Sequence, residues 1–149
     1  MPKIIQTTSE NADFRELIRK LDHELRSNYE FDQSVCEQYS QVDAIAHAMV
    51  AYVDGQAVGC GCFRVLNPET VEVKRMFVLR EFRGLGISKQ VLAALESWAA
   101  GLNFKTAVLE TGALQTEAIR LYKTYGYQSI PNYGPYVDLP HSSCFEKSL

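Results

Sequence analysis

The segment RMFVLREFRGLGISKQ, residues 75–90, decides the fold. It starts at the apolar end of a strand predicted over residues 70–79, passes through a turn with two glycines and several cations, and enters a helix predicted to end near Gly101. Because the first N–H groups of a helix have no partner inside it and the helix dipole adds partial positive charge, such a turn can bind an anion. The segment therefore predicts either a phosphate cradle or only a tight turn.

Two common phosphate motifs do not match this turn. A P-loop needs Gly-x-x-x-x-Gly-Lys-Ser/Thr, which is absent. A dinucleotide fingerprint needs a third glycine where Lys89 stands, and an acidic residue about 20 positions further on, where Lys105 and Thr106 lie. Both alternatives fail on the residues present.

The rest of the chain alternates between strands and helices. Residues 47–66 predict a hairpin, because Asp54-Gly55 accepts the positive φ of a tight turn between two apolar strands. Hydrophobic periodicity and turn residues predict the other elements. The other expected strands cover residues 3–7, 106–110, 127–130 and 144–147, and the other expected helices cover residues 13–26, 32–39 and the segment that Gly126 stops.

Length and composition restrict the class of protein. The 149 residues suit one domain, and a net charge of −3 without a basic block gives no support for an extended nucleic-acid surface. No stretch approaches the roughly 20 apolar residues that span a bilayer, and the first residues lack a long apolar segment, so we expect a cytoplasmic protein without a membrane partner. The four cysteines form no zinc pattern, and we expect reduced packing residues and no metal site.

Two motifs carry a resemblance to a known family. Residues 83–88, Arg-Gly-Leu-Gly-Ile-Ser, resemble the Arg/Gln-x-x-Gly-x-Gly/Ala signature of the GNAT-type N-acetyltransferases, with Ser88 in place of the final small residue. Residues 118–127, AIRLYKTYGY, are similar to that family's closing segment, with Tyr127 in place of Phe. An Asn usually stands three residues before this segment, and Gln115 occupies its place. Only residues 71–127 carry specific motifs, although the implied likeness covers most of the chain.

The resemblance implies a fold and a co-substrate. It implies a single α/β domain over residues 1–149, with a mixed, mostly antiparallel sheet of about six to seven strands flanked by about four helices. The co-substrate would be acetyl-CoA, and no metal would be needed. Its pyrophosphate would lie on the backbone of the turn, and its pantetheine arm on main-chain groups at the end of the preceding strand. The residues so implied are Phe77, Val78, Arg83, Gly84, Leu85, Gly86, Ile87, Ser88, Lys89 and Gln115.

Acetyl transfer to an amine requires two proton movements. Deprotonating an amine of pKa about 10.4 at pH 7 costs roughly 4 to 5 kcal/mol, so a base helps. Glu72 is the first candidate, since strand alternation predicts that it shares a face with Lys74, Met76 and Val78; the alternative is a solvated carboxylate paired with Lys74. Glu110, at the end of the strand from residue 106, is the second candidate. The resemblance implies that Tyr122 protonates the thiolate; by pattern alone it is a core tyrosine.

Aromatic residues in two loops predict an acceptor pocket, with satellite packing as the alternative. The residues are Tyr29, Phe31, Tyr133 and Tyr136. The resemblance implies an N-acetyltransferase that moves the acetyl group of acetyl-CoA to a primary amine of a small molecule, peptide or protein, by direct attack in a ternary complex. A catalytically silent acyl-CoA-binding module and a scaffold domain stay open as alternatives. The sequence leaves the acceptor and homodimer formation undecided.

Overall fold

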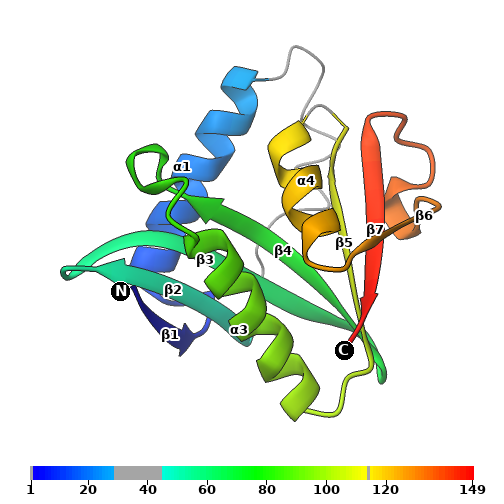
Figure 1. The fold of residues 1–149 in the computed structure, drawn as a ribbon, viewed down its shortest axis with the longest axis horizontal. Coiled ribbons are helices and arrows are strands. Elements are labelled where there is room, and N and C mark those ends of the chain that lie inside the picture. The colour runs from blue at the N-terminus through cyan, green and yellow to red at the C-terminus, as the bar shows by residue number, and fades with distance from the viewer. Residues whose placement is uncertain (1, 29–44, 114) are drawn as a thin grey trace. The chain divides into compact units, whose positions relative to one another are not determined.

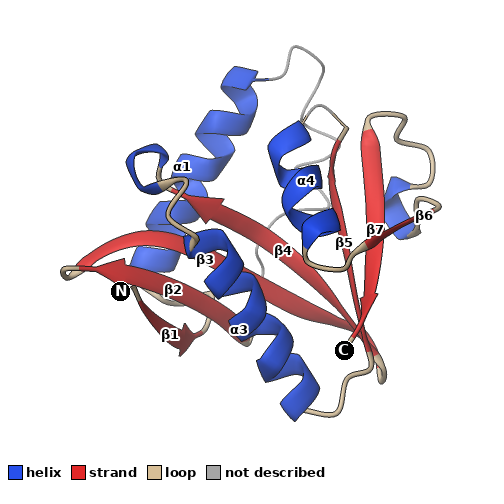
Figure 2. Ribbon diagram, in the orientation of Figure 1, coloured by secondary structure: helices blue, strands red, loops and turns tan. Residues whose placement is uncertain are grey.

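The computed structural model describes residues 2–28, 45–113 and 115–149, which form seven strands and three α-helices (Figures 1 and 2). The strands form one mixed sheet in the order β1-β2-β3-β4-β5-β7-β6. The predicted helix over residues 32–39 lies outside the described residues. The elements are β1 (Lys3–Thr7), α1 (Ala12–Asn28), β2 (His47–Val53), β3 (Gln56–Asn67), β4 (Thr70–Val78), α3 (Ile87–Gly101), β5 (Thr106–Gly112), α4 (Thr116–Thr124), β6 (Gln128–Ile130) and β7 (Ser142–Ser148), with short 3₁₀ turns at Arg80–Phe82 and Gly134–Tyr136.

The chain divides into two compact units that share β3, β4 and α3. The first unit contains Met1–Arg64 and Lys74–Leu95, and the second contains Val65–Val73 and Glu96–Leu149. Among the described helices, none is long and apolar enough to cross a membrane. Each unit is described by itself below.

The first unit is built on antiparallel pairs. β1 pairs with β2, and β2 pairs with β3 across the predicted hairpin, where Asp54 and Gly55 both take positive φ, 50° and 82°. Asn11 caps α1, because its side-chain oxygen accepts a hydrogen bond from the Phe14 N–H at 2.9 Å. Figure 1 shows α1 behind β2 and β3 and α3 in front of them. The predicted apolar stripe of α1 is buried at Phe14, Leu17, Ile18 and Leu21.

Glycines in β3 let α3 approach the strand closely. A Cβ added at Gly61 would lie 2.6 Å from Met76 Sδ, 2.9 Å from Leu95 Cδ1 and 3.0 Å from Val91 Cγ1. These distances are below normal van der Waals contact, so a larger residue would push the helix or its side chains away. Because Gly61 has no side chain, α3 can pack directly against β3.

Arg75 interrupts β4. It has φ 60°, a left-handed conformation that is unusual for a residue other than glycine, and its carbonyl accepts a hydrogen bond from the Cys60 thiol at 3.4 Å. The Arg75 Nη1 donates to Asp22 of α1, whereas Met76 contacts the α3 side. Such a residue can disturb the regular alternation of a strand, so the shared face of Glu72, Lys74, Met76 and Val78 stays a prediction across Arg75.

The second unit contains one parallel and two antiparallel pairings. β4 runs parallel to β5, with Glu72 opposite Val108, and β5 pairs with β7 along its whole length, with Glu110 opposite Cys144. β6 pairs with the other edge of β7, and Figure 2 shows β7 between β5 and β6. Because paired residues and residues two apart share a face, Glu72, Glu110 and Cys144 lie on one face of this part of the sheet.

Candidate functional site

The glycine turn before α3 has an open backbone. Gly84 and Gly86 both have φ 81°, and a Cβ added at either would meet nothing within 4 Å. The two glycines are therefore required by backbone conformation rather than by crowding within the chain. The space beside them is open, as an anion-binding turn requires.

The first turn of α3 favours an anion. Its first intrahelical hydrogen bond joins the Gln90 N–H to the Gly86 carbonyl at 3.2 Å, so the N–H groups of Ile87, Ser88 and Lys89 come before the helical ladder. This first turn contains no acidic residue, and it places the Ser88 hydroxyl and the Lys89 cation at the positive end of the helix dipole. A bound anion would interact favourably with both the helix dipole and the cation. These residues fit the pyrophosphate of a CoA molecule.

Arg83 stabilises the turn through hydrogen bonds within the chain. Its Nε donates to the Val78 carbonyl at 2.8 Å, and its Nη2 donates to both carboxylate oxygens of Glu24, at 3.0 and 2.8 Å. The guanidinium also lies 5.7 Å from the centre of the Phe77 ring. Arg83 thus ties the turn to β4 and to α1. No sequence pattern pointed to Glu24, which is one of many charged residues along α1.

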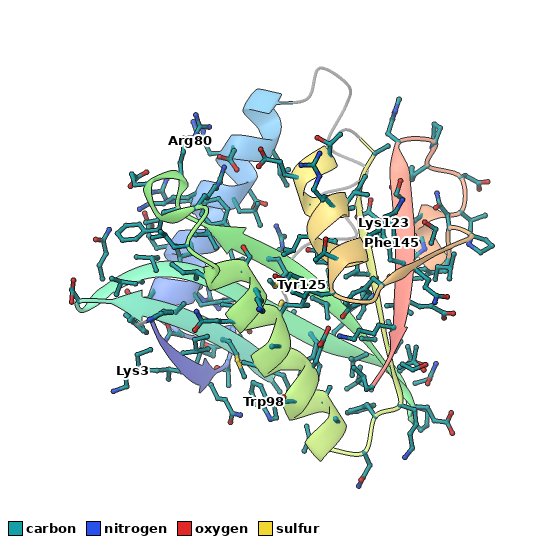
Figure 3. The ribbon with its side chains drawn as sticks, in the orientation of Figure 1. Lys3, Arg80, Trp98, Lys123, Tyr125 and Phe145 are labelled. Carbon is teal, nitrogen blue, oxygen red and sulfur yellow. The ribbon has the colours of Figure 1, made fainter. Side chains whose placement is uncertain are left out.

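Arg80 lies on the same turn and reaches the same carboxylate. Its Nη2 donates to Glu24 Oε1 at 3.3 Å, and its side chain is exposed (Figure 3). A carbonyl oxygen has two lone pairs, and one of those on Val78 accepts the hydrogen bond from Arg83. The side chain of Leu85, by contrast, is exposed.

In the second unit, Glu72 is a fully buried carboxylate. Its exposed fraction is 0%, and its Oε2 accepts a hydrogen bond from the Tyr133 hydroxyl at 2.6 Å. A buried carboxylate is tolerated when hydrogen bonds compensate for lost hydration. Burial, and then the charge of Glu72, raise the pKa of Tyr133, so this tyrosine stays protonated and donates to the carboxylate.

Glu110 is the second carboxylate on this face. Its Oε2 accepts a hydrogen bond from the Ser142 hydroxyl at 2.6 Å. The opposite residue, Cys144, is buried, and burial together with the charges of Glu110 and Glu72 raises the pKa of its thiol to about 11, against a hydrogen bond from the backbone that lowers it. Cys144 therefore stays a thiol near neutral pH and lies close to both carboxylates.

Tyr122 is buried in α4 and remains protonated. Burial raises the pKa of its hydroxyl, and the charge of Glu110 raises it further. Its ring packs edge-on against Tyr127, with 5.8 Å between the centres, and its carbonyl accepts from the Tyr127 N–H at 3.0 Å. The arrangement can supply a proton but does not favour a phenolate.

The other predicted site residues differ in their burial and in their contacts. Gln115 precedes α4, and no hydrogen bond from its side chain caps the helix, so its role as a cofactor-binding residue stays a prediction. Tyr133 is half-buried, whereas Tyr136 is only 3% exposed and packs edge-on against Tyr133 with 5.5 Å between ring centres. Tyr29 and Phe31 lie outside the described residues. Within the described chain, no group of three or more His, Cys, Asp or Glu is placed to hold a metal ion.

Two side chains that sequence reasoning missed support this region. The Asn132 amide nitrogen lies 3.0 to 3.2 Å from the carbonyl oxygens of Tyr136, Leu139 and Ser142, and so fixes the loop that carries Tyr133. Ser142 holds Glu110. Asn132 lies two residues before the Gly134-Pro135 turn, which is only a weak sequence signal that it stabilises the loop. No sequence pattern pointed to Ser142.

Comparisons with known proteins agree with this architecture. Residues 11–127 match the Acetyltransferase (GNAT) family. An IAA acetyltransferase from Azospirillum brasilense is 36% identical over 102 residues, which are 68% of this chain and 67% of that protein. A human N-acetylaspartate synthetase is 34% identical over 98 residues, which are 65% of this chain but only 32% of that protein.

Solved structures show the same fold over the whole chain. A Klebsiella pneumoniae protein described as an acyl-CoA N-acyltransferase has a TM-score of 0.84 at 32% identity, and the match covers 100% of this chain and 98% of that one. Structures of this fold have been solved with acetyl-CoA or coenzyme A bound. The chain therefore belongs to the GNAT family of acetyltransferases. The family consists of acyl-CoA-dependent N-acetyltransferases that act on amine acceptors. Membership in it confirms the predicted family, fold and enzyme class.

Proposed function

We propose that this protein transfers the acetyl group of acetyl-CoA to a primary amine of a small molecule or peptide, by direct attack in a ternary complex. The observation that carries the proposal is the open, left-handed glycine turn at the start of α3. Its N–H groups and the helix dipole suit the pyrophosphate of CoA. The bound co-substrate supplies an activated acetyl thioester.

The chain's own residues bind the co-substrate and move protons. The backbone from Arg83 to Lys89 holds the pyrophosphate, main-chain groups of Phe77 and Val78 hold the pantetheine arm, and Gln115 contributes an amide near α4. Tyr122 donates its hydroxyl proton to the leaving thiolate, for which its protonated state is the support. With a thiol pKa near 8.5 and a phenol pKa near 10, that transfer is uphill by roughly 2 kcal/mol, before burial of Tyr122 adds to it.

A carboxylate accepts the proton that the amine loses. Glu72 and Glu110 both lie on the face that also carries Cys144, and each is held by a hydroxyl donor. The half-buried Tyr133 contributes to the wall of the acceptor pocket, with Tyr136 packed behind it. Cys60 and Cys144 are excluded as nucleophiles in this mechanism, because burial raises the pKa of each thiol.

An acceptor screen tests the proposal. Acetyl-CoA would be incubated with the protein and a panel comprising tyramine, lysine, spermidine and a short peptide with a free N-terminus, and release of free thiol would be followed. We expect at least one amine to release thiol well above hydrolysis and to gain one acetyl group by mass spectrometry. If CoA binds but no member of a broadened amine panel is acetylated, the protein is a silent acyl-CoA-binding module instead.

A further inference from the structure

Tyr133 is bonded to a buried carboxylate and is itself only half-buried. The Tyr133 hydroxyl donates to Glu72 Oε2 at 2.6 Å, and Glu72 itself has no exposed surface. Tyr133 is half-buried, so part of it remains accessible. An acceptor amine outside the sheet would meet this tyrosine more readily than the carboxylate behind it.

The loop holds this hydroxyl in place. The Tyr136 N–H donates to the Tyr133 carbonyl at 2.9 Å, and the nearly buried Tyr136 ring packs edge-on against Tyr133. Asn132 ties the same loop together through the carbonyls of Tyr136, Leu139 and Ser142. A pocket wall needs only the ring, whereas this braced loop also keeps the Tyr133 hydroxyl at hydrogen-bond distance from Glu72.

The two carboxylates on this face have different neighbours. Glu72 is bonded to Tyr133, and Glu110 is bonded to Ser142. The charge of Glu110, after burial, opposes ionisation of Tyr122. Glu72 thus accepts a hydrogen bond from a tyrosine hydroxyl through which a proton can reach it, whereas Glu110 accepts from a serine hydroxyl. Titratable groups in different environments commonly divide acid and base roles.

We propose that Tyr133 is a catalytic residue that relays the acceptor's proton to Glu72. This inference rests on the proposed acetyl transfer and decides between its two candidate bases. The ammonium N–H bond breaks as its proton goes to the Tyr133 oxygen, and the original Tyr133 proton passes to Glu72. Tyr133 ends neutral, Glu72 ends protonated, and the neutral amine keeps the lone pair that forms the C–N bond.

The second proton movement protonates the leaving thiolate. As the C–N bond forms and the C–S bond breaks, Tyr122 gives its proton to the thiolate. Tyr122 then regains a proton from the nitrogen of the new amide. Glu72 later returns its proton to solvent, so the net products are the amide, the free thiol and one proton.

The test compares Tyr133→Phe and Glu72→Gln with wild type, using whichever of tyramine, lysine, spermidine or the peptide the wild type acetylates best. We expect kcat/KM near pH 7 to fall about tenfold to a hundredfold in each variant, the scale of a positioned proton-transfer group. The loss should shrink as pH rises toward the amine pKa of about 10, because the free amine then arrives without its extra proton. The double variant should be no slower than the slower single variant, because the two residues act as a unit.

Tyr52→Phe is the matched control. Tyr52 also donates to a carboxylate at 2.6 Å, Asp13, but it belongs to the first unit and has no proposed role in the reaction. We expect wild-type kinetics and pH dependence from it. A loss in Tyr133→Phe that stays constant with pH, affects KM alone or multiplies with that of Glu72→Gln would overturn the relay and leave Tyr133 as a pocket wall. An active wild type with that result keeps the acetyltransferase proposal, whereas an inactive wild type removes both.

Discussion

Replacing Gly86 by Ala separates the conformational role of the turn from its role in binding. Gly86 and Gly55 have nearly the same φ, 81° and 82°, and an added Cβ at either position meets nothing within 4 Å. Alanine in the left-handed region costs about 1 to 2 kcal/mol of unfolding free energy. Since a domain of this size loses about 2 to 4 °C of Tm per kcal/mol, both Gly86→Ala and Gly55→Ala should lower Tm by about 2 to 8 °C.

The two variants should differ in CoA binding. A methyl group at Gly86 stands in the open space where a phosphate oxygen would approach the backbone N–H groups. Loss of one hydrogen bond to a charged group is worth about 1.5 to 3 kcal/mol, so the Kd for CoA should rise about tenfold to a hundredfold in Gly86→Ala. Gly55 lies in the β2–β3 hairpin and Gly55→Ala should keep the wild-type Kd.

Isothermal titration calorimetry with CoA, paired with thermal melts of the ligand-free proteins, measures both quantities. The reasoning is refuted if Gly86→Ala binds CoA as tightly as Gly55→Ala. Equal affinities below that of wild type would mean that the loss reflects general destabilisation, and equal affinities at the wild-type level would mean that CoA does not bind at the turn.

Two further predictions concern stability. Gly61→Ala should lower the unfolding free energy by about 1 to 3 kcal/mol in a denaturant titration, because its Cβ would lie 2.6 Å from Met76 Sδ; Gly101→Ala, which meets nothing within 4 Å at the end of α3, should leave stability unchanged or slightly raised. A wild-type midpoint for Gly61→Ala would show that α3 does not pack closely on β3. The Cys144 thiol has its pKa raised to about 11 when folded, so it adds stability that is present below its unfolded pKa of about 9 and is lost as pH rises toward about 11. Melts of wild type and Cys144→Ala across that interval should show a shallower decline in the variant, and parallel curves would contradict the assignment.

Local patterns predicted the elements that local chemistry controls. The Asp54-Gly55 dipeptide predicted the hairpin because both residues tolerate the positive φ that such a turn needs, and both adopt it. The two glycines of the turn before α3 were identified for a different reason, the bare backbone that they leave at the start of a helix, and both adopt positive φ. Strand β1 and the apolar stripe of α1 followed from hydrophobic periodicity, which the buried face of the helix confirms.

Long-range contacts were beyond these patterns. The left-handed Arg75 looks ordinary in sequence, and its conformation accompanies an ion pair with Asp22, 53 positions earlier. The bond between Tyr133 and Glu72 joins residues 61 positions apart, so alternation could suggest a face for Glu72 but not its partner. The individual roles of the site residues therefore stay predictions that kinetics must test, although the family and fold are established.

The most direct measurement of the central claim is the rate of acetyl transfer in a single turnover by wild type and Tyr122→Phe, with the CoA affinity of both measured in parallel. The Phe variant keeps the ring that packs against Tyr127 and removes only the hydroxyl. The account predicts a Kd for CoA close to that of wild type and a chemical step slower by about one to three powers of ten. An unchanged chemical step with an acetylated amine as product would show that Tyr122 does not supply the proton, and would contradict the mechanism proposed for this acetyltransferase.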